Sequence, residues 1–243
     1  MIGPLTRPTR PRASPRDTLH YALFCVGLGA FALLVVVGAV RASVVRQLPS
    51  LYDAADVFAR ATELEERGDV AGAIGELTAA TYIQPQELSG YERLGFLQAA
   101  AGDAAGELAT YERAFAYNPL TPRANMVLGL AYMRRERFPE ASARLEVALG
   151  LDPHDAMLHT AVGDLRLAEK KYDEAVASFE RALDLDPLQS AIHNKAAIAY
   201  AYAGRLEVAR QHFERAVELD PGNSEAAANL AQFRASLAPG GRP

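Results

Sequence analysis

The sequence has one cysteine, Cys25, and no tryptophan. A single cysteine excludes an internal disulfide, and Cys25 falls in an apolar run, where cysteine is more typical of a small apolar filler than of a reactive thiol. The sequence also lacks a glycine-rich phosphate loop and a nucleophile elbow. We therefore expect that the chain is not an enzyme.

Histidines are few, and their spacing is not that of a metal site. His154 and His159 lie five residues apart, whereas two helical ligands of one metal lie four apart. His159 and His193 lie 34 residues apart, which is the period described below. We expect no metal, no cofactor and no small-molecule substrate.

Residues 19–40 contain no Asp, Glu, Lys or Arg. As a helix they would span about 33 Å, enough for a bilayer core of about 30 Å. We predict a single transmembrane helix over 19–40 that acts as a signal anchor. Four arginines precede it and two follow closely, which favours a cytoplasmic N-terminus and a periplasmic or otherwise extracytoplasmic remainder.

Two other interpretations of this apolar run fit the sequence less well. A cleaved signal peptide, cut near Val40-Arg41-Ala42, would have a shorter apolar run of about 7–15 residues. A lipid anchor at Cys25 would place the cysteine at the end of the run, but Cys25 stands near its beginning, after the bulky Phe24. Residues 1–18 form a basic segment rich in Pro and Arg that we expect to be disordered, and 41–53 a linker.

The rest of the chain is dominated by a period of 34 residues. It is marked by five prolines: Pro85, Pro119, Pro153, Pro187 and Pro221. Five residues before each proline stands an alanine: Ala80, Ala114, Ala148, Ala182 and Ala216. Eight before stands a large apolar residue: Leu77, Tyr111, Leu145, Phe179 and Phe213. Twenty-four before stands a tiny residue: Ala61, Gly95, Gly129, Gly163 and Ala197.

This pattern predicts pairs of closely packed helices. Ala175, Phe179 and Ala182 share one helical face, because they are spaced i, i+4, i+7. Tiny residues let two helices approach, the large residue fills the space between them, and proline ends the second helix. Thr121-Pro122 is a helix start signal. Twelve residues before the proline stands an alanine in four units, Ala73, Ala141, Ala175 and Ala209. In the second unit Glu107 takes this place.

These residues resemble the tetratricopeptide repeat family, whose unit is a helix–turn–helix of 34 residues. The resemblance implies an all-α, right-handed superhelical solenoid with units at 54–87, 88–121, 122–155, 156–189 and 190–223. We expect 224–237 to be a capping helix and 238–243 a flexible tail. The family's early aromatic in the first helix is replaced here by Val57, Tyr91, Asn125, His159 and His193.

The charge balance bears on the kind of partner. Residues 51–243 have a net charge of −10, so the array should repel nucleic acid. The pentatricopeptide family, which reads RNA, also has a period one residue longer. We therefore expect protein partners, associated with the membrane that residues 19–40 would cross.

The resemblance further implies that the first helices line a concave protein-binding groove. We predict that this groove contains Phe58, Thr62, Glu92, Phe96, Met126, Leu130, Met133, Thr160, Asp164, Leu167, Asn194 and Ile198. Only Asn194 and Lys195 match the family's clamp for a C-terminal carboxylate, so an apolar or amphipathic segment is the better fit. Two functions are open: a membrane-anchored scaffold that holds or assembles another exported protein, and a constitutive accessory subunit of a large electron-transfer, photosynthetic or secretion complex.

Overall fold

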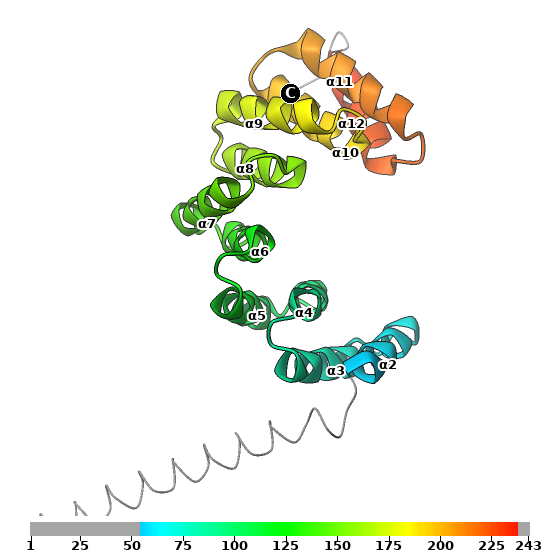
Figure 1. The fold of residues 1–243 in the computed structure, drawn as a ribbon. Helices are drawn as coiled ribbons and strands as arrows, with labels where there is room; N and C mark the ends of the chain where they lie inside the picture. The colour runs from blue at the N-terminus through cyan, green and yellow to red at the C-terminus, as the bar shows by residue number, and fades with distance from the viewer. Residues whose placement is uncertain (1–53, 238–243) are drawn as a thin grey trace, which may run out of the picture. The chain divides into compact units, whose positions relative to one another are not determined.

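The computed structural model describes residues 54–237, and these form eleven α-helices and no strand (Figure 1). The predicted basic segment 1–18, transmembrane helix 19–40, linker 41–53 and tail 238–243 all lie outside the described residues. No helix within 54–237 is long and apolar enough to cross a membrane. The contacts described below belong to one compact unit, Val57–Pro243.

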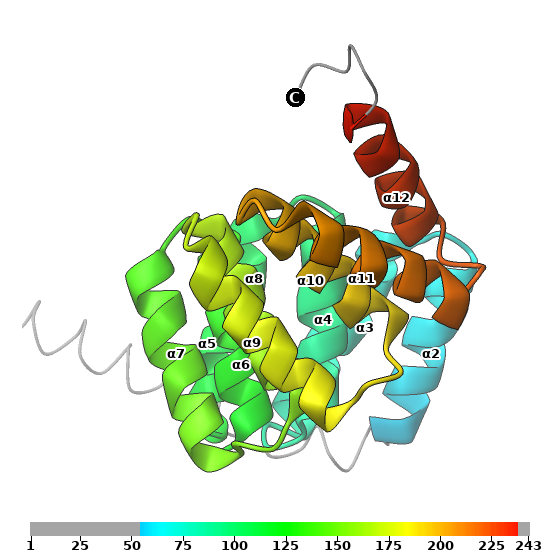
Figure 2. The same ribbon diagram turned by 90° about the horizontal axis from the view of Figure 1, so that it is seen from above.

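The helices form five successive pairs followed by a single helix. The first helices of the pairs are α2 (Ala54–Glu66), α4 (Leu88–Ala100), α6 (Pro122–Met133), α8 (Ala156–Ala168) and α10 (Ser190–Tyr202). The second helices are α3 (Val70–Ile83), α5 (Ala104–Tyr117), α7 (Phe138–Leu151), α9 (Tyr172–Leu185) and α11 (Leu206–Leu219). The single helix α12 (Ser224–Leu237) packs against α11, as α10 packs against α9 (Figures 1 and 2). The predicted all-α repeat array is confirmed.

The tiny residue of each first helix lies under the large residue of the second. A Cβ atom added at Gly95 would lie 2.3 Å from Cζ of Tyr111, and one added at Gly163 would lie 2.6 Å from Cε1 of Phe179. Tyr111 and Phe179 are themselves buried. Glycine is therefore required where an aromatic ring occupies the space that a Cβ atom would need.

The repeated prolines stand two residues after the second helices, and the carbonyl groups of the first four accept hydrogen bonds from the helix that follows. In each case the donor is the fourth side chain of the first helix. These contacts are Tyr91 Oη to Pro85 O at 3.1 Å, Asn125 Nδ2 to Pro119 O at 2.9 Å, His159 Nε2 to Pro153 O at 3.0 Å and His193 Nε2 to Pro187 O at 3.1 Å. Four of the five residues at the place of the family's early aromatic thus share one structural role, and Val57, the fifth, has no side-chain donor.

Glu107, the exception in the row of alanines, is a buried carboxylate with two arginine partners. Its side chain is 3 % exposed and forms ion pairs with Arg134 and Arg135, which follow α6. Arg135 also donates to the carbonyl of Ala131 at 2.8 Å. A charge at an alanine position is tolerated because the next unit supplies opposite charges to it.

The start of α6 and the position of α12 agree with the helix start signal and the capping helix that the sequence predicts. Helix α6 begins at Pro122, although the Thr121 side chain makes no capping hydrogen bond. In α12, Leu230 and Phe233 are buried, and the Phe233 ring lies 5.2 Å from that of Phe213. Leu237, at the last position of this helix, is 48 % exposed. Helix α12 therefore covers the last pair with Leu230 and Phe233.

Candidate functional site

We call the surface formed by α4, α6, α8, α10 and α12, with the C-terminal part of α2, the first-helix face. The predicted groove residues lie on it at different depths. Thr62 and Phe96 are exposed, and Met126 and Asn194 are buried. The other eight are half-buried: Phe58, Glu92, Leu130, Met133, Thr160, Asp164, Leu167 and Ile198. The structure therefore divides the predicted set, because some of its members pack against the next helix.

Charged and polar residues of this face are paired between successive first helices. We call these contacts the polar ladder. They are Arg93–Glu65 at 2.8 Å, Arg123–Glu92, Lys195–Asp164 at 2.5 Å, Asn194–Glu225 at 3.2 Å and Asn229–Asn194 at 3.0 Å. They join α2 to α4, α4 to α6, α8 to α10 and α10 to α12. Most of the polar groups on this face therefore already have a partner within the chain.

The polar ladder is interrupted between α6 and α8. Among the described residues, no ion pair joins these two helices. Arg123 donates instead to the sulfur of Met157 at 3.6 Å. A pocket with a volume of about 350 Å³ lies here. We call it the α6–α8 pocket; it is lined by Met126, Leu130, Ala156, Met157, Thr160, Ala161, Asp164, Asp186, Gln189 and Ile192.

Four predicted groove residues meet in this pocket: Met126, Leu130, Thr160 and Asp164. Ile198 lines another pocket, described below, and the remaining seven line neither of the two. Met126 is 3 % exposed, so it lines the pocket without protruding into it.

The remaining lining residues were missed by sequence reasoning. Met157 is the second residue of α8, and Ile192 is the third residue of α10. Asp186 and Gln189 belong to the connection between α9 and α10. The repeat phase identifies which face of a helix is shared between units. It does not reveal that a connection also borders the pocket, although Asp186 stands directly before a repeated proline.

Asp164 lines the α6–α8 pocket and is also part of the polar ladder. Burial raises the pKa of its carboxyl group, and the ammonium of Lys195 opposes that shift. The Lys195 nitrogen lies 2.5 Å from Asp164 Oδ2, so the ion pair keeps a partly desolvated charge compensated. Asp164 is therefore already paired within the chain, and Lys195 compensates its negative charge.

The two residues that match a carboxylate clamp are both engaged within the chain. Asn194 is 2 % exposed; its Nδ2 donates to Glu225, and its Oδ1 accepts from Asn229. Lys195 is bound to Asp164. A carboxylate ligand would have to break these contacts, because both donors already have acceptors.

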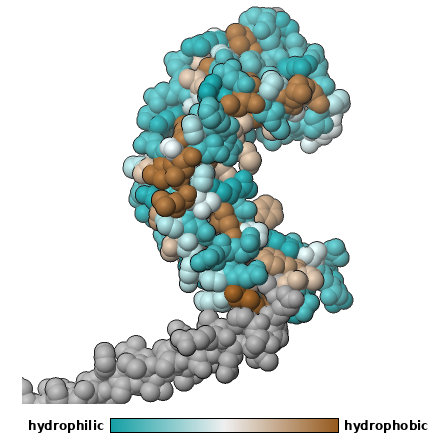
Figure 3. Space-filling view, viewed as in Figure 1, coloured by the Kyte–Doolittle hydropathy of each residue, from teal (hydrophilic) through white to brown (hydrophobic). Residues whose placement is uncertain are grey.

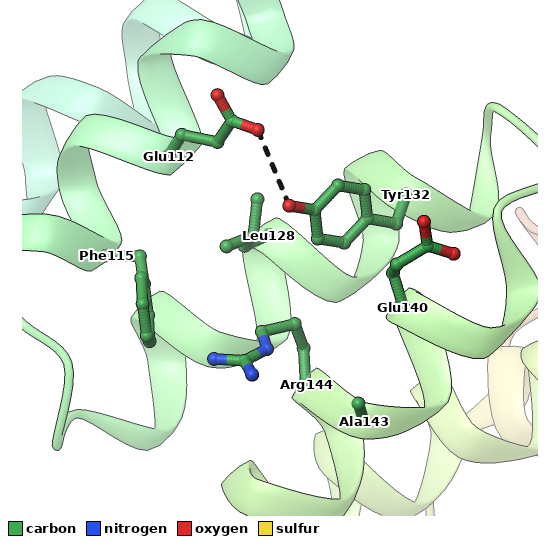
Figure 4. Close-up of a pocket in the computed structure, with 7 residues that line it drawn as sticks. All are labelled: Glu112, Phe115, Leu128, Tyr132, Glu140, Ala143 and Arg144. Atoms are coloured by element: carbon green, nitrogen blue, oxygen red, sulfur yellow. Dashed lines mark hydrogen bonds between the residues drawn. The ribbon is translucent and has the colours of Figure 1, made fainter.

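A second pocket lies beside the second helices, between α5 and α7 and over α6 (Figure 4). Its volume is about 330 Å³. Tyr132 donates to Glu112 at 3.4 Å, and the Arg144 guanidinium lies 4.9 Å from the centre of the Phe115 ring. Burial, with Glu112 beside it, raises the pKa of Tyr132. The pocket is bordered by groups that already interact across α5, α6 and α7.

The equivalent place two units later is filled. Tyr200 donates to Glu180 at 2.6 Å, and burial together with Glu180 raises the pKa of Tyr200 to about 12. His212 stands where Arg144 stands in the earlier unit, and it stacks on Tyr200 with ring centres 5.2 Å apart. His193 also packs against His212, with ring centres 5.2 Å apart. These contacts hold α9, α10 and α11 together.

A third pocket, of about 530 Å³, lies between α10, α11 and α12. It contains the exposed side chains of Tyr202, Leu206 and Leu237. One unit earlier, Tyr202 stacks on Tyr172 with ring centres 5.1 Å apart. At α12 the residue in the place of Tyr202 is Ser236, which leaves the space open.

The face of residues 54–237 that Figure 3 presents is mainly hydrophilic. Figure 3 shows separate hydrophobic patches divided by hydrophilic surface on the face that it presents. Residues 54–237 contain 18 Lys or Arg and 28 Asp or Glu. Within this range no three His, Cys, Asp or Glu side chains gather as a metal-binding group.

Comparison with known proteins identifies what this arrangement is similar to. The model of a family described as tetratricopeptide repeat matches residues 97–156, 126–190, 160–224 and 194–237, which together cover more than half of the chain. No curated protein matches the sequence.

Solved structures share the fold at low sequence identity. TTC0263, a thermophilic TPR protein of Thermus thermophilus, is 24 % identical with a TM-score of 0.64, over 75 % of this chain and 99 % of that one. Pseudomonas aeruginosa pilF is 19 % identical with a TM-score of 0.59, over 74 % and 88 % of the two chains. YrrB, described as a TPR protein with an unusual peptide-binding site, is 20 % identical with a TM-score of 0.51, over 72 % and 91 %.

Proposed function

Because the chain belongs to the tetratricopeptide repeat family, we propose that it is a protein-binding scaffold that holds a segment of another protein at the α6–α8 pocket. The observation that carries this proposal is the interruption of the polar ladder. Elsewhere on the first-helix face the polar groups are paired within the chain, and a partner would gain little by contacting them. At the interruption an apolar pocket offers surface whose burial stabilises a complex.

The proposed role is binding and not catalysis. Asp164 is committed to Lys195, and the apolar side chains around it have no chemistry to offer a substrate. Methionine side chains adapt their shape to a partner, which suits the exposed Met157 to a protein segment.

We further propose that the scaffold is anchored by a membrane helix over residues 19–40, with the array on the extracytoplasmic side. The support is the absence of charge from this run and the excess of arginine before it. Protease added outside spheroplasts should then digest the array while a cytoplasmic marker stays intact. An array that survives until the membrane is broken would contradict this topology.

The binding proposal is tested by crosslinking from within the pocket. A photo-crosslinking residue replaces Met157, which is 54 % exposed, in the full chain in its native membrane. We expect one protein to be crosslinked reproducibly, and Leu130→Glu to abolish the product because it places a charge in the apolar wall.

The matched control is Leu120→Glu, which makes the same change at a leucine that is 79 % exposed and does not line the pocket. It should leave the crosslink unchanged. Equal products from the parent chain, Leu130→Glu and Leu120→Glu would contradict the assignment of the pocket.

Extraction in mild detergent separates the two roles that such a scaffold can have. A crosslinked partner that co-migrates in fixed stoichiometry without crosslinking identifies an accessory subunit of a membrane complex. A partner that is lost on extraction identifies an assembly factor that binds transiently.

A further inference from the structure

The connection between α9 and α10 gives the α6–α8 pocket a negative edge. On this ground we infer that the pocket binds a protein segment in which a large apolar side chain is followed closely by a lysine or an arginine. The inference rests on the proposed function, since it names the chemistry of the segment that this face would hold. Three features support it. The pocket has apolar walls, a carboxylate without an ion pair lies at its edge, and the neighbouring cations are already ion-paired within the chain.

The apolar wall comes from three successive first helices. Met126 and Leu130 project from α6, Met157 from α8 and Ile192 from α10. Met157 is the exposed member, and the others are buried or half-buried. A pocket of about 350 Å³ with such walls suits one or two large aliphatic side chains of a partner.

Asp186 is the unpaired carboxylate at the edge of the pocket. It accepts hydrogen bonds from the Leu188 backbone at 3.4 Å and from Gln189 Nε2 at 2.8 Å, which are neutral donors. Within the described part of the chain it makes no ion pair. Its charge is therefore not neutralised by a cation, in contrast to that of Asp164.

The position of Asp186 strengthens the negative potential there. Asp186 caps the C-terminus of α9, where the last carbonyl groups carry partial negative charge, and the last turn of α9 has no basic residue. Asp155, at the N-terminus of α8, lies beside Met157 and caps its backbone amide at 2.7 Å. In residues 54–237 it has no ion pair either. A cation placed at this edge of the pocket would be favoured and an anion disfavoured.

The cations nearest to the pocket are occupied, so they do not reverse this preference. Arg123 is paired with Glu92, and Lys195 with Asp164. Since each of these pairs is neutral, the formal charge at the edge is that of Asp186, while the charge of Asp155 is partly offset by the N-terminus of α8 that it caps. The preferred ligand is thus opposite in sign to a C-terminal carboxylate.

Selection from a random peptide library tests the inference without knowledge of the natural partner. Short peptides displayed on phage are selected on the full chain in detergent, and those that also bind the Leu130→Glu variant are discarded. We expect the retained peptides to share a Leu, Ile, Met or Phe with a Lys or Arg close to it in the sequence. Peptides in which this neighbour is neutral or acidic would overturn the inference.

Two matched variants then locate the charge. Asp186→Asn should weaken binding of a selected peptide about two- to fivefold, as expected for an exposed ion pair, and the loss should shrink at high salt. Asp152→Asn removes the same charge from the corresponding cap of α7 and does not touch the pocket, so it should leave the affinity unchanged. An equal loss in both variants would show a general charge effect and overturn the assignment to Asp186.

The outcomes also separate this inference from the proposed function. A library that yields no peptide sensitive to Leu130→Glu, together with no crosslink from position 157, contradicts binding at this pocket altogether. Peptides or a crosslinked partner that depend on Leu130 but lack the basic residue contradict only the charge preference.

Discussion

His193 and His212 face each other through their Nδ1 atoms, which lie 3.0 Å apart. His193 Nε2 lies 3.1 Å from the carbonyl oxygen of Pro187 and must donate to it, because a carbonyl can only accept. The neutral His193 ring therefore accepts at Nδ1, and His212 donates at its own Nδ1. The contact fixes one tautomer for each of the two neutral rings.

This histidine pair predicts that the array loses stability in mild acid. Burial lowers the pKa of both rings below the ordinary value of 6.5; Arg215 adds to this for His193, as His193 does for His212, and Glu180 opposes it for His212. The unfolded chain then binds more protons below about pH 6.5, so stability is present above that pH and falls as the pH drops through it. Chemical denaturation of the purified full chain at several pH values between about 7.5 and 5 measures this slope.

The variant His212→Gln should flatten the slope, because glutamine does not titrate. His154→Gln, at an exposed histidine of the connection before α8, is the matched control and should keep the parent slope. A parent chain that is equally stable at neutral pH and in mild acid would be inconsistent with a pair of buried neutral rings.

Glu107 predicts an asymmetry between a single and a double substitution. Glu107→Gln should lower the free energy of unfolding by about 1–3 kcal/mol, since it leaves the buried part of Arg135 without a counter-charge. Glu107→Ala with Arg135→Leu should recover much of this loss, because four other units have alanine at this position. Urea denaturation measures both, and a double variant less stable than Glu107→Gln would contradict the explanation.

The glycines of the helices predict opposite effects of one substitution. Gly163→Ala should cost about 1–3 kcal/mol, because its Cβ atom would lie 2.6 Å from the Phe179 ring. Gly75→Ala, inside α3 with nothing within 4 Å of the added atom, should instead stabilise the chain by about 0.5–1 kcal/mol. Thermal unfolding of the two variants should shift in opposite directions, and a shared direction would refute the packing argument.

The pocket beside α12 predicts a stabilising substitution. Ser236→Tyr places a ring against Leu206, as Tyr202 lies on Tyr172 one unit earlier. We expect a gain of about 0.5–1 kcal/mol from the buried ring. Ala235→Tyr, at an exposed neighbour that does not line the pocket, should give no gain in the same unfolding measurement. A similar gain from both would mean that the pocket is not what accepts the ring.

The sequence was sufficient to predict the helical array because its spacing follows directly from packing. Tiny residues at Gly95 and Gly163 and large ones at Tyr111 and Phe179 recur at one period, and each pair makes the contact that the period implies. The transmembrane helix over 19–40 stays a prediction, because it lies outside the described residues.

The site was less predictable, because repeat phase assigns a residue to a face and not to a depth. Met126 and Asn194 occupy the same position of their units, and each is buried. The interruption of the polar ladder depends on which side chains happen to face each other between α6 and α8. Asp186 contributes from a connection, where no helical period applies.

The hydrogen bond to the proline carbonyl is made by side chains of different chemistry in four successive units. Tyr91 donates through a phenol group, Asn125 through an amide, and His159 and His193 through imidazole rings. The side chain at this place can therefore be exchanged for another hydrogen-bond donor without a change in the spacing of the repeats.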